Sequence, residues 1–222
     1  MWPLAGLELR CADLVLRPTV DSDCVALGRI VHGLLDPAEA HFMPGLMANA
    51  RAETATVTAR NLLRWNWERC AELSAQRWVI PLTVLVDGEV VGSQALHTVD
   101  FAVLGDVHTG SYLAREHRGR GVGTAMRAIV LEFAFAHLGA STASSAYATG
   151  NVASARISQR VGYLDDGLVL DSFDGVRFEY RRQRLDAQRW CDHRPGWLDG
   201  LEVRGLAPVL GLLGLDGAAP VR

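Results

Sequence analysis

Residues 118–124 read Arg-Gly-Arg-Gly-Val-Gly-Thr, and this stretch decides how the chain is interpreted. It follows a predicted strand, His108–Ala114, and opens a predicted amphipathic helix, Val122–His137. Glycine lets a backbone approach a ligand closely, and the first turn of a helix offers unpaired N–H groups and a partial positive charge to an anion. The pattern Arg118-x-x-Gly121-x-Gly123 therefore predicts a phosphate cradle, and a diphosphate is the expected guest.

Two better-known phosphate loops do not fit this stretch. A dinucleotide fingerprint needs Gly-x-Gly-x-x-Gly, whereas Gly119, Gly121 and Gly123 are spaced Gly-x-Gly-x-Gly. A Walker A loop needs a lysine, and this chain has none, because all 22 of its basic residues are arginine. A flexible surface loop that happens to be rich in glycine stays open as the structural alternative.

Length and composition limit the kinds of protein that this chain can be. A chain of 222 residues can bury a substantial core in one domain, and a net charge of −3 gives no footprint for nucleic acid. The four cysteines are far apart and the histidines lack a zinc-binding pattern, so we expect free thiols and no metal. We see neither a signal peptide nor an apolar run that could span a membrane, and we expect a cytoplasmic protein.

The other elements are predicted from apolar periodicity and turn residues. In chain order they are a strand Leu7–Pro18, helices from Asp21 or Ser22 to Leu35 and over Thr54–Ser74, strands Arg77–Val86 and Glu89–Val99, a loop Asp100–Asp106, a strand Ser141–Ala148, a helix Ala153–Val161, and strands Tyr163–Leu170 and Val176–Leu185. Asp87-Gly88 and Asp174-Gly175 indicate hairpin turns. This order is typical of an α+β fold with a βαβ unit between antiparallel hairpins.

We expect one domain over residues 1–185 and an extension over 186–222 that packs on it. The apolar run Leu206–Leu215 is expected either to pack within the chain or to form a homodimer interface.

The combined pattern resembles the GNAT superfamily of CoA-dependent N-acyltransferases. That resemblance is carried by Arg118, Gly121 and Gly123 at a strand–helix junction, by Asn151-x-x-Ser154, and by Val161-Gly162-Tyr163. Together with the lead-in Gly110-Ser111-Tyr112-Leu113, the motifs Asn151-x-x-Ser154 and Val161-Gly162-Tyr163 resemble the RimJ/RimL-like branch. A bacterial subgroup that includes users of succinyl-CoA is further resembled by Gly123-Thr124-x-Met126-Arg127-Ala128, by Phe133-Ala134-Phe135 and by the extension, which is rich in arginine and tryptophan.

The resemblance implies a GNAT fold, a mostly antiparallel central sheet flanked by helices, and a pose for acyl-CoA. Pantetheine would fill a gap between the strand ending at Leu113 and the strand Ser141–Ala148. The residues implied in holding CoA are Leu113, Arg118, Gly119, Arg120, Gly121, Val122, Gly123, Thr124 and Asn151.

Two residues are candidates for the chemistry. Ser154 matches the family position that faces the sulfur and could protonate the thiolate, although capping a helix is the alternative role for both Asn151 and Ser154. Asp100 could act as a general base, directly or through water, or it could be an ordinary turn carboxylate. Direct attack by an amine in a ternary complex needs no protein nucleophile.

We therefore expect an N-acyltransferase that moves an acetyl or succinyl group from acyl-CoA to a primary amine. The acceptor would be a small molecule or the N-terminus or a lysine of a protein; no metal, nucleic acid or membrane is expected to take part. A regulatory or interaction protein that binds CoA without turning over an acceptor is the alternative.

Overall fold

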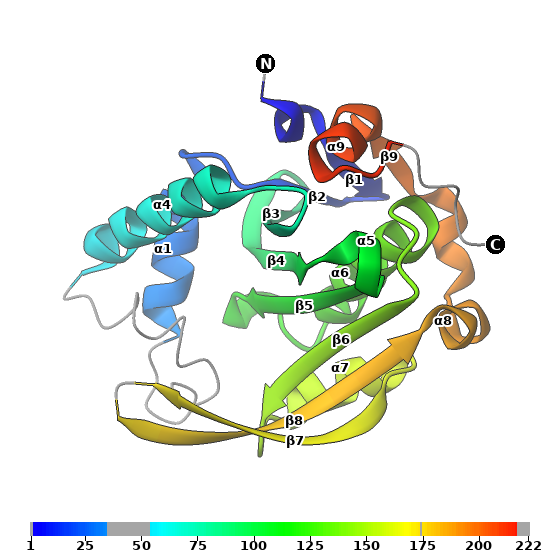
Figure 1. Ribbon diagram of the computed structural model, residues 1–222. Helices are drawn as coiled ribbons and strands as arrows, with labels where there is room; N and C mark the ends of the chain where they lie inside the picture. The colour runs from blue at the N-terminus through cyan, green and yellow to red at the C-terminus, as the bar shows by residue number, and fades with distance from the viewer. Residues whose placement is uncertain (1, 35–53, 174, 217–222) are drawn as a thin grey trace.

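The structure is a computed structural model that describes residues 2–34, 54–173 and 175–216. One nine-stranded sheet runs through it in the order β7-β8-β6-β5-β4-β3-β2-β1-β9 (Figure 1). The strands are β1 (Glu8–Cys11), β2 (Leu14–Pro18), β3 (Arg77–Val86), β4 (Glu89–Val99), β5 (Asp106–Leu113), β6 (Thr142–Ala148), β7 (Leu164–Phe173), β8 (Val176–Asp186) and β9 (Glu202–Arg204). The α-helices are α1 (Asp23–Gly33), α4 (Ala55–Glu72), α5 (Phe101–Leu104), α6 (Val122–Glu132), α7 (Val152–Arg160), α8 (Ala187–His193) and α9 (Leu206–Leu213).

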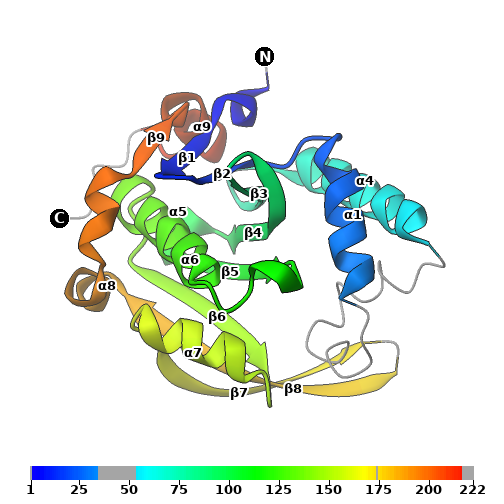
Figure 2. The same ribbon diagram turned by 180° about the vertical axis from the view of Figure 1, so that it is seen from behind.

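Helices cover both faces of this sheet. Figure 2 shows α6 and α7 across one face, and α1 and α4 lie side by side in both views. Neighbouring side chains on β5 mark the two faces: Ser111 contacts α6, whereas Tyr112 packs against a cluster that includes Leu27 of α1 and Leu62 of α4. The mixed, mostly antiparallel sheet and its flanking helices confirm the predicted α+β GNAT fold.

The two predicted hairpins are present. Asp87 and Gly88 both have positive φ angles, 49° and 82°, as a two-residue turn between right-twisted strands requires. In the second hairpin β7 and β8 pair up to Phe173 and Val176, while Asp174 lies outside the described residues.

Two predictions near the ends of elements were wrong. The predicted strand Leu7–Pro18 is a hairpin, β1 and β2, that turns at Ala12 with a φ of 53°. The turn has neither glycine nor proline, so the usual sequence signal was missing. The predicted loop Asp100–Asp106 contains the single-turn helix α5.

Helix α1 begins after Ser22, one of the two predicted N-cap residues, but the Ser22 side chain forms no capping hydrogen bond. Instead the buried Asp23 accepts hydrogen bonds from the N–H of Val20, from the Thr83 hydroxyl and from both terminal nitrogens of Arg17. These bonds hold the pKa of Asp23 below its usual value, although burial by itself would raise it. The same contacts fasten the start of α1 to strands β2 and β3.

Helix α6 follows the prediction and continues as a π-helical turn, Phe133–His137. Its residues from Met126 to Phe135 are all buried, and this run includes Arg127 and Glu132. The helix therefore forms the centre of the main core.

The C-terminal residues complete the sheet. Strand β9 pairs with β1, with Val203 opposite Leu9, and Val209 and Leu213 of α9 are buried in the main core. The apolar run predicted at Leu206–Leu215 thus packs within the chain.

A buried carboxylate fastens this extension to α6. One oxygen of Glu132, Oε2, accepts a hydrogen bond from the indole N–H of Trp190 and another from Nε of Arg194, both at 2.9 Å. Arg194 also pairs with Asp199 at 2.7 Å. The charge of Glu132 is therefore matched inside the core.

Within the described part of the chain, none of the helices combines the length and apolar character needed to cross a bilayer. All four cysteines are free thiols, and Cys11 and Cys24 are buried.

We predict that Glu132→Ala lowers the free energy of unfolding by about 2 kcal/mol, because Trp190 and Arg194 lose a buried acceptor. Glu202→Ala is the matched control, since its ion pair with Arg204 is exposed and should contribute less than about 1 kcal/mol. Urea unfolding of both variants measures the difference. Equal destabilisation by the two substitutions would contradict the anchoring role of Glu132.

Candidate active site

The candidate site is a gap in the sheet between β5 and β6. These strands form the one parallel pair among the described strands, and they pair over only four residues, from Asp106 opposite Thr142 to Thr109 opposite Ser145. Beyond this point each strand stays bonded to its outer neighbour, β4 or β8. The two strands therefore part, as the resemblance implied.

A cavity of about 510 Å³ fills the gap and reaches the N-terminus of α6. This volume lies in the range of small-molecule sites. Its lining comes from β5, the glycine-rich loop, α6, β6 and α7: Thr109, Gly110, Ser111, Tyr112, Leu113, Arg118, Gly119, Gly121, Gly123, Thr124, Met126, Arg127, Ala146, Tyr147, Asn151, Val152, Ala153, Ser154, Arg156, Ile157 and Arg160.

The charge of this lining contrasts with that of the protein. The described lining residues include four arginines, Arg118, Arg127, Arg156 and Arg160, and no aspartate or glutamate. The whole chain has a net charge of −3. The cavity is thus a local site of positive charge in an acidic protein.

The glycines of the loop adopt conformations that other residues avoid. Gly119 has a φ of 73°, and Gly121, the N-cap of α6, has a φ of 90°. An added Cβ would meet no atom within 4 Å at either position, so the backbone there is open to a ligand. At Gly123 a Cβ would lie 2.9 Å from Ile157 of α7, so this glycine allows α6 and α7 to pack closely.

Arg118 links the loop to the end of β5. Its Nε donates a hydrogen bond to the carbonyl of Leu113 at 3.2 Å, and both residues line the cavity. Arg120 and Val122, which were also predicted to hold CoA, are not among the lining residues.

One edge of β5 faces the gap. The N–H of Ala114 bonds to Val91 of β4, and backbone groups in a strand alternate between its two edges. The N–H groups of Ser111 and Leu113 therefore point toward β6, where the strands have parted.

Helix α7 brings Asn151 and Ser154 to the opposite side of the cavity. The side-chain oxygen of Asn151 accepts a hydrogen bond from the backbone N–H of Ser154 at 3.1 Å, so Asn151 caps the helix. This cap engages the backbone N–H of Ser154 and not its hydroxyl. Ser154 itself is half-buried and lines the cavity.

The position of Asp100 does not support its predicted role as the base. Leu113, beside the cavity, pairs with Gly92 near the start of β4, whereas Asp100 follows the other end of that strand. There it precedes α5 and its N–H bonds to the carbonyl of Gln76. Asp100 is thus a residue of a turn remote from the gap.

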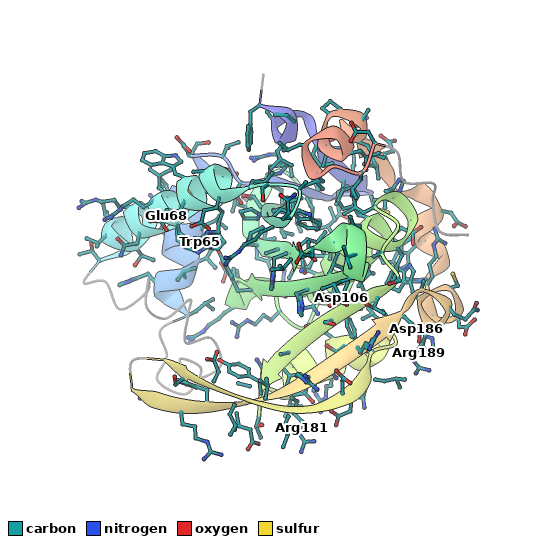
Figure 3. The ribbon with its side chains drawn as sticks, in the orientation of Figure 1. Trp65, Glu68, Asp106, Arg181, Asp186 and Arg189 are labelled. Carbon is teal, nitrogen blue, oxygen red and sulfur yellow. The ribbon has the colours of Figure 1, made fainter. Side chains whose placement is uncertain are left out.

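The side chains near that remote end form their own network. His97 and His108 stack with ring centroids 5.1 Å apart, and Asp106, labelled in Figure 3, lies 3.3 Å from His108 Nε2. Burial and the neighbouring His108 lower the pKa of His97 to about 4. The hydroxyls of Thr142 and Ser144 also donate to Asp106, so this cluster secures the paired part of β5 and β6.

The sequence analysis gave Arg127 no role in the site, although this residue lines the cavity from the second turn of α6. Only 4% of Arg127 is exposed. From Val122 to Leu131 it is the only charged residue, and an isolated charge in an apolar helix was a signal that could have been used.

Comparison with known proteins agrees with this geometry. Residues 13–164 match the acetyltransferase (GNAT) domain family. A Bacillus subtilis protein named "Putative ribosomal N-acetyltransferase YdaF" is 27% identical over 136 residues, which cover 60% of this chain and 72% of that protein.

Solved structures show the same fold. Mycobacterium smegmatis RimJ in complex with CoA-disulfide superposes with a TM-score of 0.68 at 21% identity, over 90% of this chain and 97% of that one. RimL, a ribosomal L7/L12 α-N-protein acetyltransferase, in complex with CoA superposes with a TM-score of 0.65 at 13% identity, over 80% and 96%.

The family match spans more than half of the chain, including the glycine-rich loop and the parted strands. The chain therefore belongs to the GNAT family of acyl-CoA-dependent N-acyltransferases.

Proposed function

We propose that this protein transfers an acetyl or succinyl group from its CoA thioester to the α-amino group of a protein, by direct attack in a ternary complex. The observation that carries the proposal is the cavity between β5 and β6, which joins an open strand edge to the N-terminus of α6. Two similar proteins bear the names putative ribosomal N-acetyltransferase and ribosomal L7/L12 α-N-protein acetyltransferase, which favours a protein N-terminus over a small amine.

The diphosphate of CoA would bind at the start of α6. The first backbone N–H groups of a helix have no partner within it, and the 11-residue helix α6 adds its dipole. Gly119 and Gly121 leave the approach open, and Arg118 lies beside them. Arg156 and Arg160 on α7 supply further positive charge for phosphate oxygens.

The pantetheine arm would occupy the gap as an added strand segment. The N–H groups of Ser111 and Leu113 face this gap, so they are available to the amides of the arm and to the thioester carbonyl. A backbone N–H held in a rigid strand is a suitable donor for the oxyanion that forms when the carbonyl is attacked.

The reaction needs few groups from the protein. The neutral amine attacks the thioester carbonyl, the tetrahedral intermediate collapses with cleavage of the C–S bond, and the CoA thiolate takes a proton. Ser154 on the cavity wall is our candidate for delivering that proton. The proton lost by the amine passes to water.

The nature of the described lining favours an α-amino acceptor. It contains no aspartate, glutamate or histidine that could remove a proton from the amine. At pH 7.5 about a third of an α-amino group is already neutral, against about one in a thousand for a lysine side chain. An acceptor of low pKa therefore suits a site in which these residues provide no base.

We predict that Gly121→Trp lowers CoA affinity at least about 100-fold, since the side chain would enter the cavity and cover the N-terminus of α6. Gly139→Trp is the matched control. Gly139 has a similar positive φ of 76° and equal free space, but it follows the other end of the same helical segment. Calorimetric titration with CoA should separate the two, and unchanged affinity in Gly121→Trp would refute the cradle.

Ser154→Ala should lower kcat by about 100-fold and leave CoA affinity unchanged, because the hydroxyl is lost while the cap from Asn151 remains. Asp100→Asn, remote from the gap, should retain full activity. Thiol release under saturating donor measures both. A Ser154→Ala enzyme with normal kcat would leave that hydroxyl without a chemical role.

The acceptor class is tested with two peptides of the same sequence. One has a free N-terminus and no lysine, and the other has an acetylated N-terminus and one internal lysine. We expect turnover of the first to exceed that of the second by at least about 100-fold at pH 7.5, following the neutral fractions of the two amines. Preference for the lysine peptide would overturn the assignment of an α-amino acceptor.

A further inference from the structure

The two edges of the nine-stranded sheet are built differently. At one edge, β9 has three residues, and its exposed residues Glu202 and Arg204 form an ion pair at 2.8 Å. Short, charged edge strands discourage pairing with other chains. At the other edge, β7 has ten residues, and among the described strands it pairs with β8 alone (Figure 1). The edge at β7 is therefore the one at which a further strand can add.

Strand β7 exposes aliphatic side chains at this edge. Leu168, Val169 and Leu170 follow one another and are 50%, 39% and 56% exposed, and Leu164 is 51% exposed. Successive side chains of a strand point to opposite faces, so this run is apolar on both faces of the sheet. A long apolar edge strand is a site of association between chains unless it is covered.

The backbone groups that β7 presents at its open edge belong to Leu168 and Leu170. The residue after β6 donates a hydrogen bond to the carbonyl of Glu179 on β8, so the backbone groups of the next residue, Tyr180, point the other way, toward β7. Tyr180 lies opposite Val169, whose own N–H and C=O are therefore directed at β8. The two leucines beside Val169 direct theirs outward.

We propose that β7 pairs antiparallel with β7 of a second copy of this chain, about a two-fold axis at Val169. In this register Val169 faces the partner's Val169 as a non-hydrogen-bonded pair. Leu168 exchanges backbone hydrogen bonds with the partner's Leu170, and Leu170 does so with the partner's Leu168. The pairing covers the apolar run on both faces and continues the sheet from one protomer into the other.

The acidic residues of β7 select this register. Because outward-facing backbone groups alternate along a strand, a symmetric pair places one residue of β7 opposite its own copy. Counted along the chain, an axis at Leu168 would put Asp165 opposite the partner's Asp171, and like charges in that position destabilise a sheet. An axis at Val169 puts Asp171 opposite the partner's Gly167 instead. The strand is thus complementary to itself, which favours a second copy as its partner.

The acidic charges at one end of the apolar run are matched within each protomer. Asp165 lies 3.3 Å from Arg181 and Asp166 lies 3.7 Å from Arg182, and both arginines belong to β8. The backbone carbonyl of Asp166 also accepts hydrogen bonds from Arg182. These ion pairs reduce the repulsion between the acidic residues of two β7 strands.

Sedimentation equilibrium tests the association. We expect the wild-type protein to reach twice the 24.1 kDa of one chain at micromolar concentrations. Val169→Asp would place two carboxylates opposite each other at the axis and should raise the dissociation constant of the dimer at least about 100-fold. Val176→Asp is the matched control, since Val176 is 51% exposed on the same hairpin but belongs to the inner strand β8. Both variants should keep the wild-type circular dichroism spectrum and CoA affinity, which shows that they fold.

A disulfide tests the register. In a Cys191→Ser background, which removes the exposed thiol, Val169→Cys should cross-link to its own copy on mild oxidation, because non-hydrogen-bonded pairs bring side chains close enough for a disulfide. Ser172→Cys, on the same edge but away from the axis, should not cross-link. Non-reducing gel electrophoresis reads out both.

A wild-type protein that stays monomeric at every concentration would overturn the proposal, and so would a Val169→Asp variant that dimerises as well as Val176→Asp. Cross-linking through Ser172→Cys in place of Val169→Cys would overturn the axis at Val169.

Discussion

The site depends on one interruption of hydrogen bonding: the ladder between β5 and β6 ends after four residue pairs. Unpaired strand edges inside a domain are costly unless something bonds to them. Here each strand remains fixed by its outer neighbour, so the gap stays open without loss of the sheet. The opening is thus a feature of the sheet itself, with N–H groups of β5 directed into it.

The flanks of this opening explain how a weakly acidic protein can receive a highly anionic cofactor. Glycines at positive φ expose the N-terminus of α6, and arginines are the only charged residues among the described lining. Because the favourable charges are local, they act at short range in a site partly removed from water. The net charge of −3 by itself would have suggested a poor site for an anion, whereas the charged residues of the described lining are all arginines.

The elements that sequence reasoning predicted correctly have local signals. Asp87-Gly88 requires a particular turn, and the glycine-rich loop before an apolar helix requires a particular junction. The turn at Ala12 was not predicted, because a residue other than glycine adopts a positive φ angle there. The role of Asp100 as a base was predicted for another reason. The sequence shows that Asp100 follows the strand β4, but it does not show which end of β4 lies beside the gap between β5 and β6. The place of Arg127 in the cavity lining was not predicted, because only packing shows that this charged side chain is buried.

The pairing of β9 with β1 has a consequence for how the chain folds during synthesis. One edge of the sheet, at β1, acquires its neighbour only after Val203 has emerged, since Val203 lies opposite Leu9. Contacts between such distant segments form slowly, and an uncovered strand edge invites association with other chains in the meantime. The edge at β1 is therefore open to such association until β9 has been synthesised, and the pairing of β9 with β1 ends this period.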